Sequence, residues 1–274
     1  MQKVILSVAP VSNAATALDP KAIADDVAAS YHAGASMVHL HSRDREGRLV
    51  ADTALLGETV ALIRAQCPIV IEISTGGVSN LTIEQRCQTC LPDWVECNSL
   101  NVGSVNLGDL VYQNPIRDVR YCVQQILQHG KIPEIEVFEI GMMETARVLA
   151  EAYPFVSPLF FALVLGHPGA MPATVAALDL MLRGLQAFFP DPNQVVWGIT
   201  EAHRTDWSLI REALERGAKA VRIGFEDSDS LSPSLRAENN AQLVTELAAL
   251  VRATGALPAT PAEARALLKI PAHS

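Results

Sequence analysis

The feature that most constrains the fold is a repeated alternation of short apolar segments with longer amphipathic ones along the 274 residues. The apolar segments predict eight strands, at 4–9, 37–41, 69–74, 94–99, 134–139, 159–165, 195–200 and 220–225. The amphipathic segments predict eight helices, at 20–34, 53–66, 82–90, 115–129, 144–153, 172–189, 207–216 and 237–254. Such alternation implies parallel strands joined by helical crossovers.

The count and length favour an α/β fold of the (β/α)8 TIM-barrel type over an open doubly wound sheet. The first strand is not followed by the G-x-G-x-x-G sequence that many open nucleotide-binding sheets carry. Residues 260–263 read Thr-Pro-Ala-Glu, a capping box that predicts a short C-terminal helix. We expect one barrel domain over residues 1–274, because no linker, repeat or low-complexity segment interrupts the pattern.

Composition excludes several functional classes. The net charge of -9 and the lack of a Lys/Arg run argue against nucleic acid as a partner. The longest strongly apolar stretch, 158–166, is too short to cross a bilayer, and no signal peptide precedes the first strand. Five cysteines with scattered spacing do not suggest a disulfide framework. We therefore expect a soluble protein of the reduced cytoplasm.

The second predicted strand carries two histidines, His39 and His41. Side chains alternate along a strand, so both imidazoles point to the same face and can bind one metal ion. An isolated His-x-His is more often a pair of ordinary strand histidines. A carboxylate at Glu226, after the eighth strand, favours the metal site, because two His and one carboxylate are a catalytic zinc set. Iron(II) oxygenases use the same ligands.

Active sites of such barrels lie at the carboxyl ends of the strands, where this chain places further polar residues. Arg222, on the eighth strand, can bind a carboxylate or pair with Asp227. Asp227 beside a guanidinium would stay ionised and could serve as a base. Glu136, on the fifth strand, is a second candidate for proton transfer. The alternatives are a solvated loop or helix cap for residues 226–227 and a structural salt bridge for Glu136.

Seven further polar residues near the strand ends are candidates for binding a substrate. Ser74, Thr75 and Gly76 form a turn whose hydroxyl and N–H groups suit a carboxylate or phosphate. The others are Ser99, Asn101, Glu201 and His203. The remaining histidines, His32, His129, His167 and His273, have no partner in the pattern and are interpreted as structural.

Taken in order, several segments resemble the β-keto acid cleavage enzymes, whose founding member is 3-keto-5-aminohexanoate cleavage enzyme. The segments read Val-His-Leu-His-Ser-Arg-Asp at 38–44, Ser-Thr-Gly-Gly at 74–77, Ser-Leu-Asn at 99–101, Pro-Glu-Ile-Glu-Val-Phe at 133–138 and Val-Arg-Ile-Gly-Phe-Glu-Asp at 221–227. Further matches lie at 172–174 and 240–244, so the similarity covers nearly the whole chain.

The resemblance implies a zinc-dependent acyltransferase that converts a β-keto acid and acetyl-CoA into acetoacetate and a new acyl-CoA. It places zinc on His39, His41 and Glu226, the substrate carboxylate near Ser74 and Ser99, and a carbanion-forming dyad at Arg222 and Asp227. Glu136 would assist a later step. The resemblance also implies a homo-oligomer, and we expect a tetramer.

The chain departs from the family pattern after its first strand. Members commonly have Thr-Gly-Ala there, often followed by an acid that meets an amino group on the substrate, whereas this chain has Val-Ser-Asn-Ala at 11–14. We expect a different acyl group. Two rival hypotheses are a CoA-independent metal-dependent aldolase or hydrolase on the same barrel, and a non-catalytic binding protein.

Overall fold

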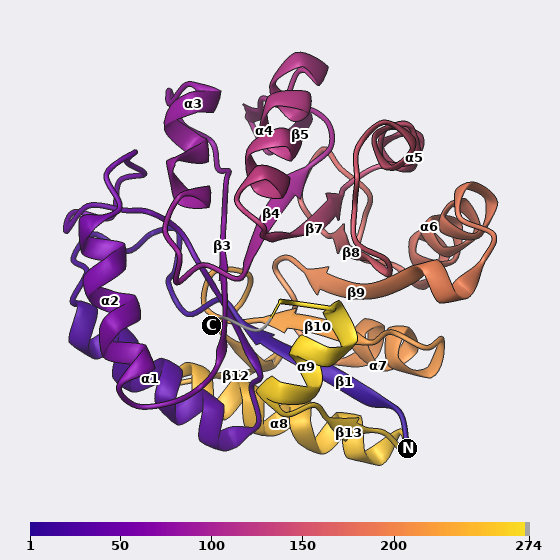
Figure 1. Ribbon diagram of the computed structural model, residues 1–274. Coiled ribbons are helices and arrows are strands. Elements are labelled where there is room, and N and C mark those ends of the chain that lie inside the picture. The colour runs from indigo at the N-terminus through magenta and orange to yellow at the C-terminus, as the bar shows by residue number, and fades with distance from the viewer. Residues whose placement is uncertain (272–274) are drawn as a thin grey trace.

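The computed structural model describes residues 1–271 and has nine α-helices, two short 3-10 helices and thirteen strands there, with α-helices surrounding a closed barrel of strands (Figure 1). The barrel strands are β1 (Lys3–Val8), β2 (Met37–Leu40), β3 (Val70–Ile73), β4 (Cys97–Asn101), β7 (Ile132–Val137), β8 (Leu159–Leu165), β9 (Val195–Glu201) and β10 (Ala220–Ile223). Each pairs with its neighbour in parallel, and pairing of β10 with β1 closes the ring. The predicted (β/α)8 barrel is confirmed.

The helices between the strands are α1 (Pro20–Ala33), α2 (Ala54–Arg64), α3 (Ile83–Arg86), α4 (Ile116–Gln128), α5 (Gly141–Ala152), α6 (Val175–Phe188), α7 (Ser208–Glu215) and α8 (Asn240–Ala253). Local chemistry explains where α1 begins: the Asp19 carboxylate accepts a hydrogen bond from the Lys21 N–H at 2.9 Å, and Pro20 stands at the first helical position. No described helix is long and apolar enough to cross a membrane.

Most predicted strands differ from the observed ones by a residue or two at an end, and two strands are shifted as a whole along the chain. The fourth strand was expected at 94–99, but β4 covers Cys97–Asn101, because residues 92–95 form a turn in which the Val95 N–H donates to the Pro92 carbonyl. The fifth strand was expected at 134–139, but β7 begins at Ile132 and ends at Val137. Pro133 therefore lies inside the strand instead of before it.

The connection after β4, expected to be a loop, contains an antiparallel hairpin. Its strands are β5 (Val105–Leu107) and β6 (Leu110–Tyr112), with Gly108 at a φ of 62° in the turn. The Gly108 N–H donates to the Pro168 carbonyl at 2.8 Å, which ties the hairpin to the loop after β8. A second hairpin, β11 (Ser230–Ser232) with β12 (Leu235–Arg236), follows β10.

The two ends of the barrel are chemically different. At the amino-terminal end, each strand contributes one inward apolar side chain, and α9 (Pro261–Leu268) packs over this layer; the layer comprises Ile5, Met37, Val70, Cys97, Ile132, Phe160, Val196 and Ala220. A larger apolar core fills the space between the barrel and the surrounding helices. Above the apolar layer the interior becomes polar, and the candidate site lies there.

Candidate active site

The strand register brings the polar residues of the interior to common levels. His39 on β2 lies beside Glu72 on β3, and Arg222 on β10 lies beside Ser7 on β1. On the opposite side of the barrel, Glu136 on β7 lies beside Asn101 on β4. Side chains two residues apart share a face, so these strands aim their polar groups into one enclosed space.

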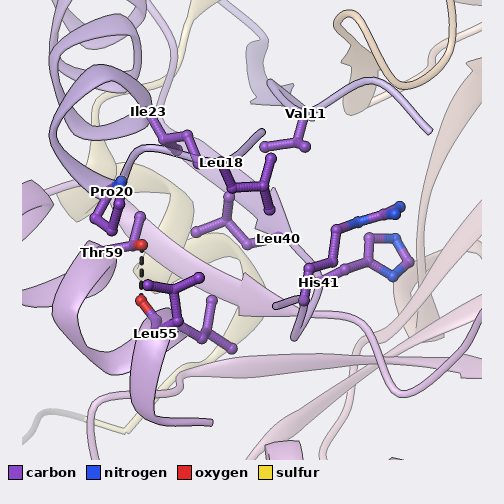
Figure 2. Close-up of a pocket in the computed structure, with 10 residues that line it drawn as sticks. Val11, Leu18, Pro20, Ile23, Leu40, His41, Leu55 and Thr59 are labelled. Atoms are coloured by element: carbon purple, nitrogen blue, oxygen red, sulfur yellow. Dashed lines mark hydrogen bonds between the residues drawn. The ribbon is translucent and has the colours of Figure 1, made fainter. Parts of the chain in front are cut away.

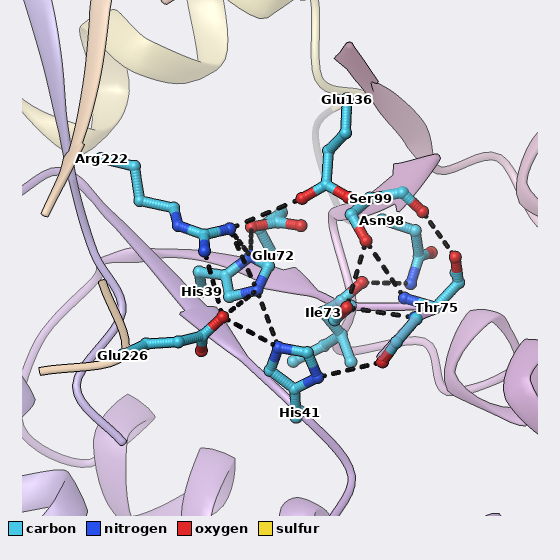
Figure 3. Close-up of polar contacts among 12 residues, drawn as sticks. His39, His41, Glu72, Ile73, Thr75, Asn98, Ser99, Glu136, Arg222 and Glu226 are labelled. Carbon is cyan, nitrogen blue, oxygen red and sulfur yellow. Dashed lines mark hydrogen bonds and ion pairs between the residues drawn. The ribbon is translucent and has the colours of Figure 1, made fainter. Parts of the chain in front are cut away.

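The side chains of His39, His41 and Glu226 converge as a metal site would require (Figure 3). The Nε2 atoms of His39 and His41 are 3.2 Å apart, and Glu226 Oε1 lies 3.2 Å from His41 Nε2 and 3.7 Å from His39 Nε2. Ligands about 2.0–2.1 Å from a tetrahedral ion are themselves separated by roughly 3.3 Å. The three predicted ligand residues therefore fit a tetrahedral ion.

The hydrogen bonds made by the Nδ1 atoms of the two histidines determine whether their Nε2 atoms keep a free lone pair. The carbonyl of Gly76 can only accept, so His41 Nδ1, 3.2 Å away, must donate its N–H and leave Nε2 unprotonated. His39 Nδ1 is 2.5 Å from Glu72 Oε2. Burial lowers the pKa of His39 to about 4, which keeps the ring neutral at pH 7. Neutral imidazoles facing a carboxylate are the donor set a divalent cation needs.

Arg222 holds the acidic residues around this cluster together. Its Nε and Nη2 lie 3.1 and 2.8 Å from the two carboxylate oxygens of Asp227, a bidentate pair. Nη2 also lies 3.0 Å from Glu226 Oε1, and Nη1 lies 3.5 Å from Glu136 Oε1. Burial lowers the pKa of Arg222, but these acids outweigh burial and raise it well above its ordinary value.

The two candidate proton-transfer acids differ in their access to the cavity. A cavity of about 600 Å³ is lined by His39, His41, Glu136, Arg222 and Glu226, among others. Asp227 is 8% exposed and is not among the lining residues. Burial raises the pKa of Glu136, against the opposing charge of Arg222. Glu136 is thus open to a substrate, whereas Asp227 is reached through Arg222.

The predicted carboxylate-binding turn is a hydrogen-bonded connection between β3 and β4. Ser74 Oγ lies 3.2 Å from Ser99 Oγ, and the Thr75 hydroxyl donates to the Ser99 carbonyl at 2.7 Å. Ser74 and Gly77 line the main cavity, whereas Thr75, Gly76, Ser99 and Asn101 do not. The Asn101 side chain accepts from the Gly103 N–H at 3.0 Å and so shapes a turn.

Glu201 and His203 lie in a second cavity of about 470 Å³, beside the glycine-containing loop after β8. Burial raises the pKa of Glu201 to about 7. The ring of His203 lies 5.8 Å from that of His167, centroid to centroid. His167 lines both cavities, so these two predicted residues lie next to the main cavity but outside it.

Sequence reasoning missed several residues that share the site. Glu72 is fully buried and forms a second cluster with His39 and the buried Glu134, whose ligand atoms all lie within 4.8 Å of one another. The available signal was a charged residue in the apolar strand β3, at the position paired with His39. His167 was interpreted as structural, yet it lines both cavities; His273 lies outside the described residues.

A separate small pocket lies on the outer side of β2 and holds about 20 Å³ (Figure 2). Its walls are mostly aliphatic side chains, including Leu18, Ile23 and Leu40, and its Thr59 hydroxyl already donates to the Leu55 carbonyl at 2.8 Å. That space holds about one water molecule. His41 and Arg43 line this pocket as well as the main cavity, but its volume leaves no room for a substrate, so we place the candidate site in the main cavity.

The fold is a closed (β/α)8 barrel, and two His, a carboxylate and an ion-paired acid meet at the carboxyl ends of its strands. This combination is typical of barrel enzymes. The model of the beta-keto acid cleavage enzyme family matches residues 3–270, and the chain belongs to that family.

Individual relatives agree with this assignment, and a solved structure shares the fold. The chain is 30% identical to a 3-keto-5-aminohexanoate cleavage enzyme from Acetoanaerobium sticklandii, covering 90% of this chain and 89% of the relative. It is 33% identical to a 3-oxoadipate:acetyl-CoA acetyltransferase from Cupriavidus necator, covering 89% and 84%. The apo structure of ObcA has a TM-score of 0.76 at 19% identity and shares the fold; the match covers 92% of this chain but 65% of that one.

Proposed function

We propose that this enzyme transfers an acyl group between a β-keto acid and acetyl-CoA, giving acetoacetate and a new acyl-CoA. Family membership and two relatives whose names specify acetyl-CoA transfer support the reaction class. The single observation that carries the proposal is the convergence of His39, His41 and Glu226 beside the Arg222–Asp227 pair at one end of the barrel.

In this proposal, His39, His41 and Glu226 would hold a divalent ion, zinc first among the candidates, and the ion would supply Lewis-acid polarisation of the substrate's keto group. Glu72 orients the His39 ring through Nδ1, and the Gly76 carbonyl does the same for His41. Ser74 faces the cavity and is placed to donate to the substrate carboxylate. The second cavity, with Glu201 and His203, offers room for acetyl-CoA.

The Arg222–Asp227 dyad removes a proton from C2 of the keto acid. Asp227 lies behind Arg222, so one carboxylate oxygen must leave the bidentate pair to reach that proton. The C2 carbanion attacks the acetyl thioester and releases CoA as thiolate. The thiolate then attacks the original keto carbon, and the bond from that carbon to C2 breaks. Acyl-CoA forms, and C2 regains a proton to give acetoacetate, a step in which Glu136 assists.

Exchange of the C2 protons separates the two acids. In deuterium oxide without acetyl-CoA, the enzyme should exchange C2 protons of a keto acid substrate, and Asp227→Asn should slow this about 100-fold or more. Glu136→Gln should keep the exchange while losing turnover. Exchange lost in Glu136→Gln and kept in Asp227→Asn would reverse the two assignments.

The reaction itself is tested by measuring acetoacetate from acetyl-CoA with a panel of β-keto acids, with and without chelator. Chelator-sensitive product from at least one acid is the expected result, and His39→Ala should lose bound metal and turnover together. Product formed without CoA would favour the aldolase or hydrolase alternative. Full zinc and full activity in His39→Ala would show that the metal lies elsewhere.

A further inference from the structure

Arg43, which follows β2, is a buried cation on the wall of the main cavity that the proposed mechanism leaves without a role. Its side chain is 7% exposed and contributes to the cavity lining. Nη1 donates to the Gly47 carbonyl at 2.8 Å, and Nη2 donates to Asn13 Oδ1 at 2.6 Å. Both acceptors are neutral, so the guanidinium is held in place by hydrogen bonds and not by an ion pair.

The other two arginines that line this cavity are compensated. Arg222 is paired with Asp227 and Glu226, and Arg48 lies 2.7 Å from Asp44. Among the described residues, no carboxylate lies within 4.0 Å of the Arg43 guanidinium. A guanidinium has five N–H donors, and Arg43 uses two of them, with its buried Nε unpartnered. A buried charge of this kind favours an anionic partner.

The position of Arg43 also relates it to the reacting centre. It is two residues from His41, and both side chains line the main cavity. Asn13, its hydrogen-bond partner, lines the same cavity from the loop after β1.

We propose that Arg43, positioned by Asn13, is a carboxylate-binding subsite of the main cavity. The proposal rests on the proposed function, because a β-keto acid brings a carboxylate to this cavity. The carboxylate has two possible sources: the one at C1, common to all β-keto acids, or a second one at the far end of a dicarboxylic substrate's acyl group. The chemistry at Arg43 is the same for both, a charge-assisted bidentate contact.

Asn13→Asp tests this subsite with almost no change of shape. The new carboxylate stands where Asn13 Oδ1 now accepts from Arg43, so it supplies an internal counter-ion and keeps the hydrogen bond. Arg48→Gln is the matched control, because Arg48 lines the same cavity but is already paired with Asp44. Thermal unfolding of each variant checks that the fold is kept.

The substrates to compare are 3-oxohexanoate and 3-oxohexanedioate, which differ only in a terminal methyl or carboxylate. Asn13→Asp should lower kcat/KM by about 10- to 100-fold, as expected for loss of a hydrogen bond to a charged group. A loss with both acids assigns Arg43 to the C1 carboxylate; a loss with the dioate alone assigns it to the distal one. A change below about threefold with both acids, equal to that in Arg48→Gln, overturns the subsite.

Binding of unreactive carboxylates separates this subsite from the reaction. Calorimetry with hexanoate and hexanedioate should show Kd values raised about 10-fold in Asn13→Asp, for one or both probes. If no β-keto acid is turned over but this difference is present, the subsite stands and the proposed function fails. If acids are turned over but neither kcat/KM nor Kd responds to Asn13→Asp, the function stands and the subsite fails.

Discussion

The two ring nitrogens of His39 face different partners, with different consequences. Its Nε2 faces His41 and Glu226, whereas its Nδ1 is hydrogen-bonded to Glu72, which is completely buried. Burial raises the pKa of Glu72 to about 8, so the carboxyl ionises readily only when a nearby cation compensates it. A metal ion on His39 would provide that cation, which couples ion binding to the charge on Glu72.

Replacing Glu72 with Gln should therefore weaken metal binding about 10- to 100-fold, because the amide cannot supply the negative charge behind His39. Competition with a chromophoric chelator measures this affinity directly. Glu134→Gln is the matched control: Glu134 belongs to the same buried cluster, but among the described residues it makes no hydrogen bond to His39. Equal affinities in the two variants would remove Glu72 from the metal site.

His167 gives the stability a defined dependence on pH. Burial lowers the pKa of His167 to about 4, with His203 and Arg222 adding to the effect. Between about pH 4 and 6.5 the unfolded chain binds a proton that the folded chain does not, so stability rises with pH in this window. Going from pH 6.5 to 4, the wild type should lose about 2 kcal/mol more than His167→Gln. Urea unfolding at each pH measures this difference; parallel losses would contradict it.

At the scale of elements, periodicity predicted the strands and helices because each barrel strand is buried on both faces and each helix on one. The loops were less predictable. The β5–β6 hairpin was missed, because its short strands, with exposed Leu110 and Val111, do not show the alternation of a half-buried strand. The convergence of His39, His41 and Glu226 was predictable, since all three lie at strand ends; that they bind a metal stays a prediction. Glu72 and Arg43 were not predictable, because their roles depend on contacts between elements.

The turn after β3 and the β5–β6 hairpin meet at a position that only glycine fits. A Cβ on Gly76 would lie 1.3 Å from the Tyr112 hydroxyl and 2.5 Å from its ring carbon Cζ. Gly76→Ala must therefore displace Tyr112, at a cost of about 1–3 kcal/mol in the free energy of unfolding. In a Tyr112→Leu background the same change should cost at least about 1 kcal/mol less. If denaturant unfolding shows that the free-energy costs of Gly76→Ala and Tyr112→Leu simply add, the strain does not arise between these two residues.

At the scale of the whole molecule, the polar residues of the candidate site and the apolar residues that stabilise the fold lie at opposite ends of the barrel. The carboxyl ends of the strands carry the polar site, whereas the amino ends carry an apolar layer covered by α9. Glu96, which is 1% exposed, anchors this lower end by accepting hydrogen bonds from Arg265 on α9 and from Arg64 on α2. Unlike Glu72, Glu96 keeps a lowered pKa despite its burial, because the two arginines compensate it.

This separation predicts that damage to the lower end changes stability but not the reaction. Leu268 on α9 is fully buried against the apolar layer, so Leu268→Ala should cost about 2–5 kcal/mol in the free energy of unfolding. Metal affinity and kcat/KM below the unfolding transition should change less than about twofold, since the apolar layer lies between α9 and the polar residues of the site. His41→Ala should show the opposite pattern, with metal binding lost. If Leu268→Ala also weakened metal binding tenfold or more, the two ends would be coupled through the barrel, and the packing of α9 against the apolar layer would help to set the geometry of the site.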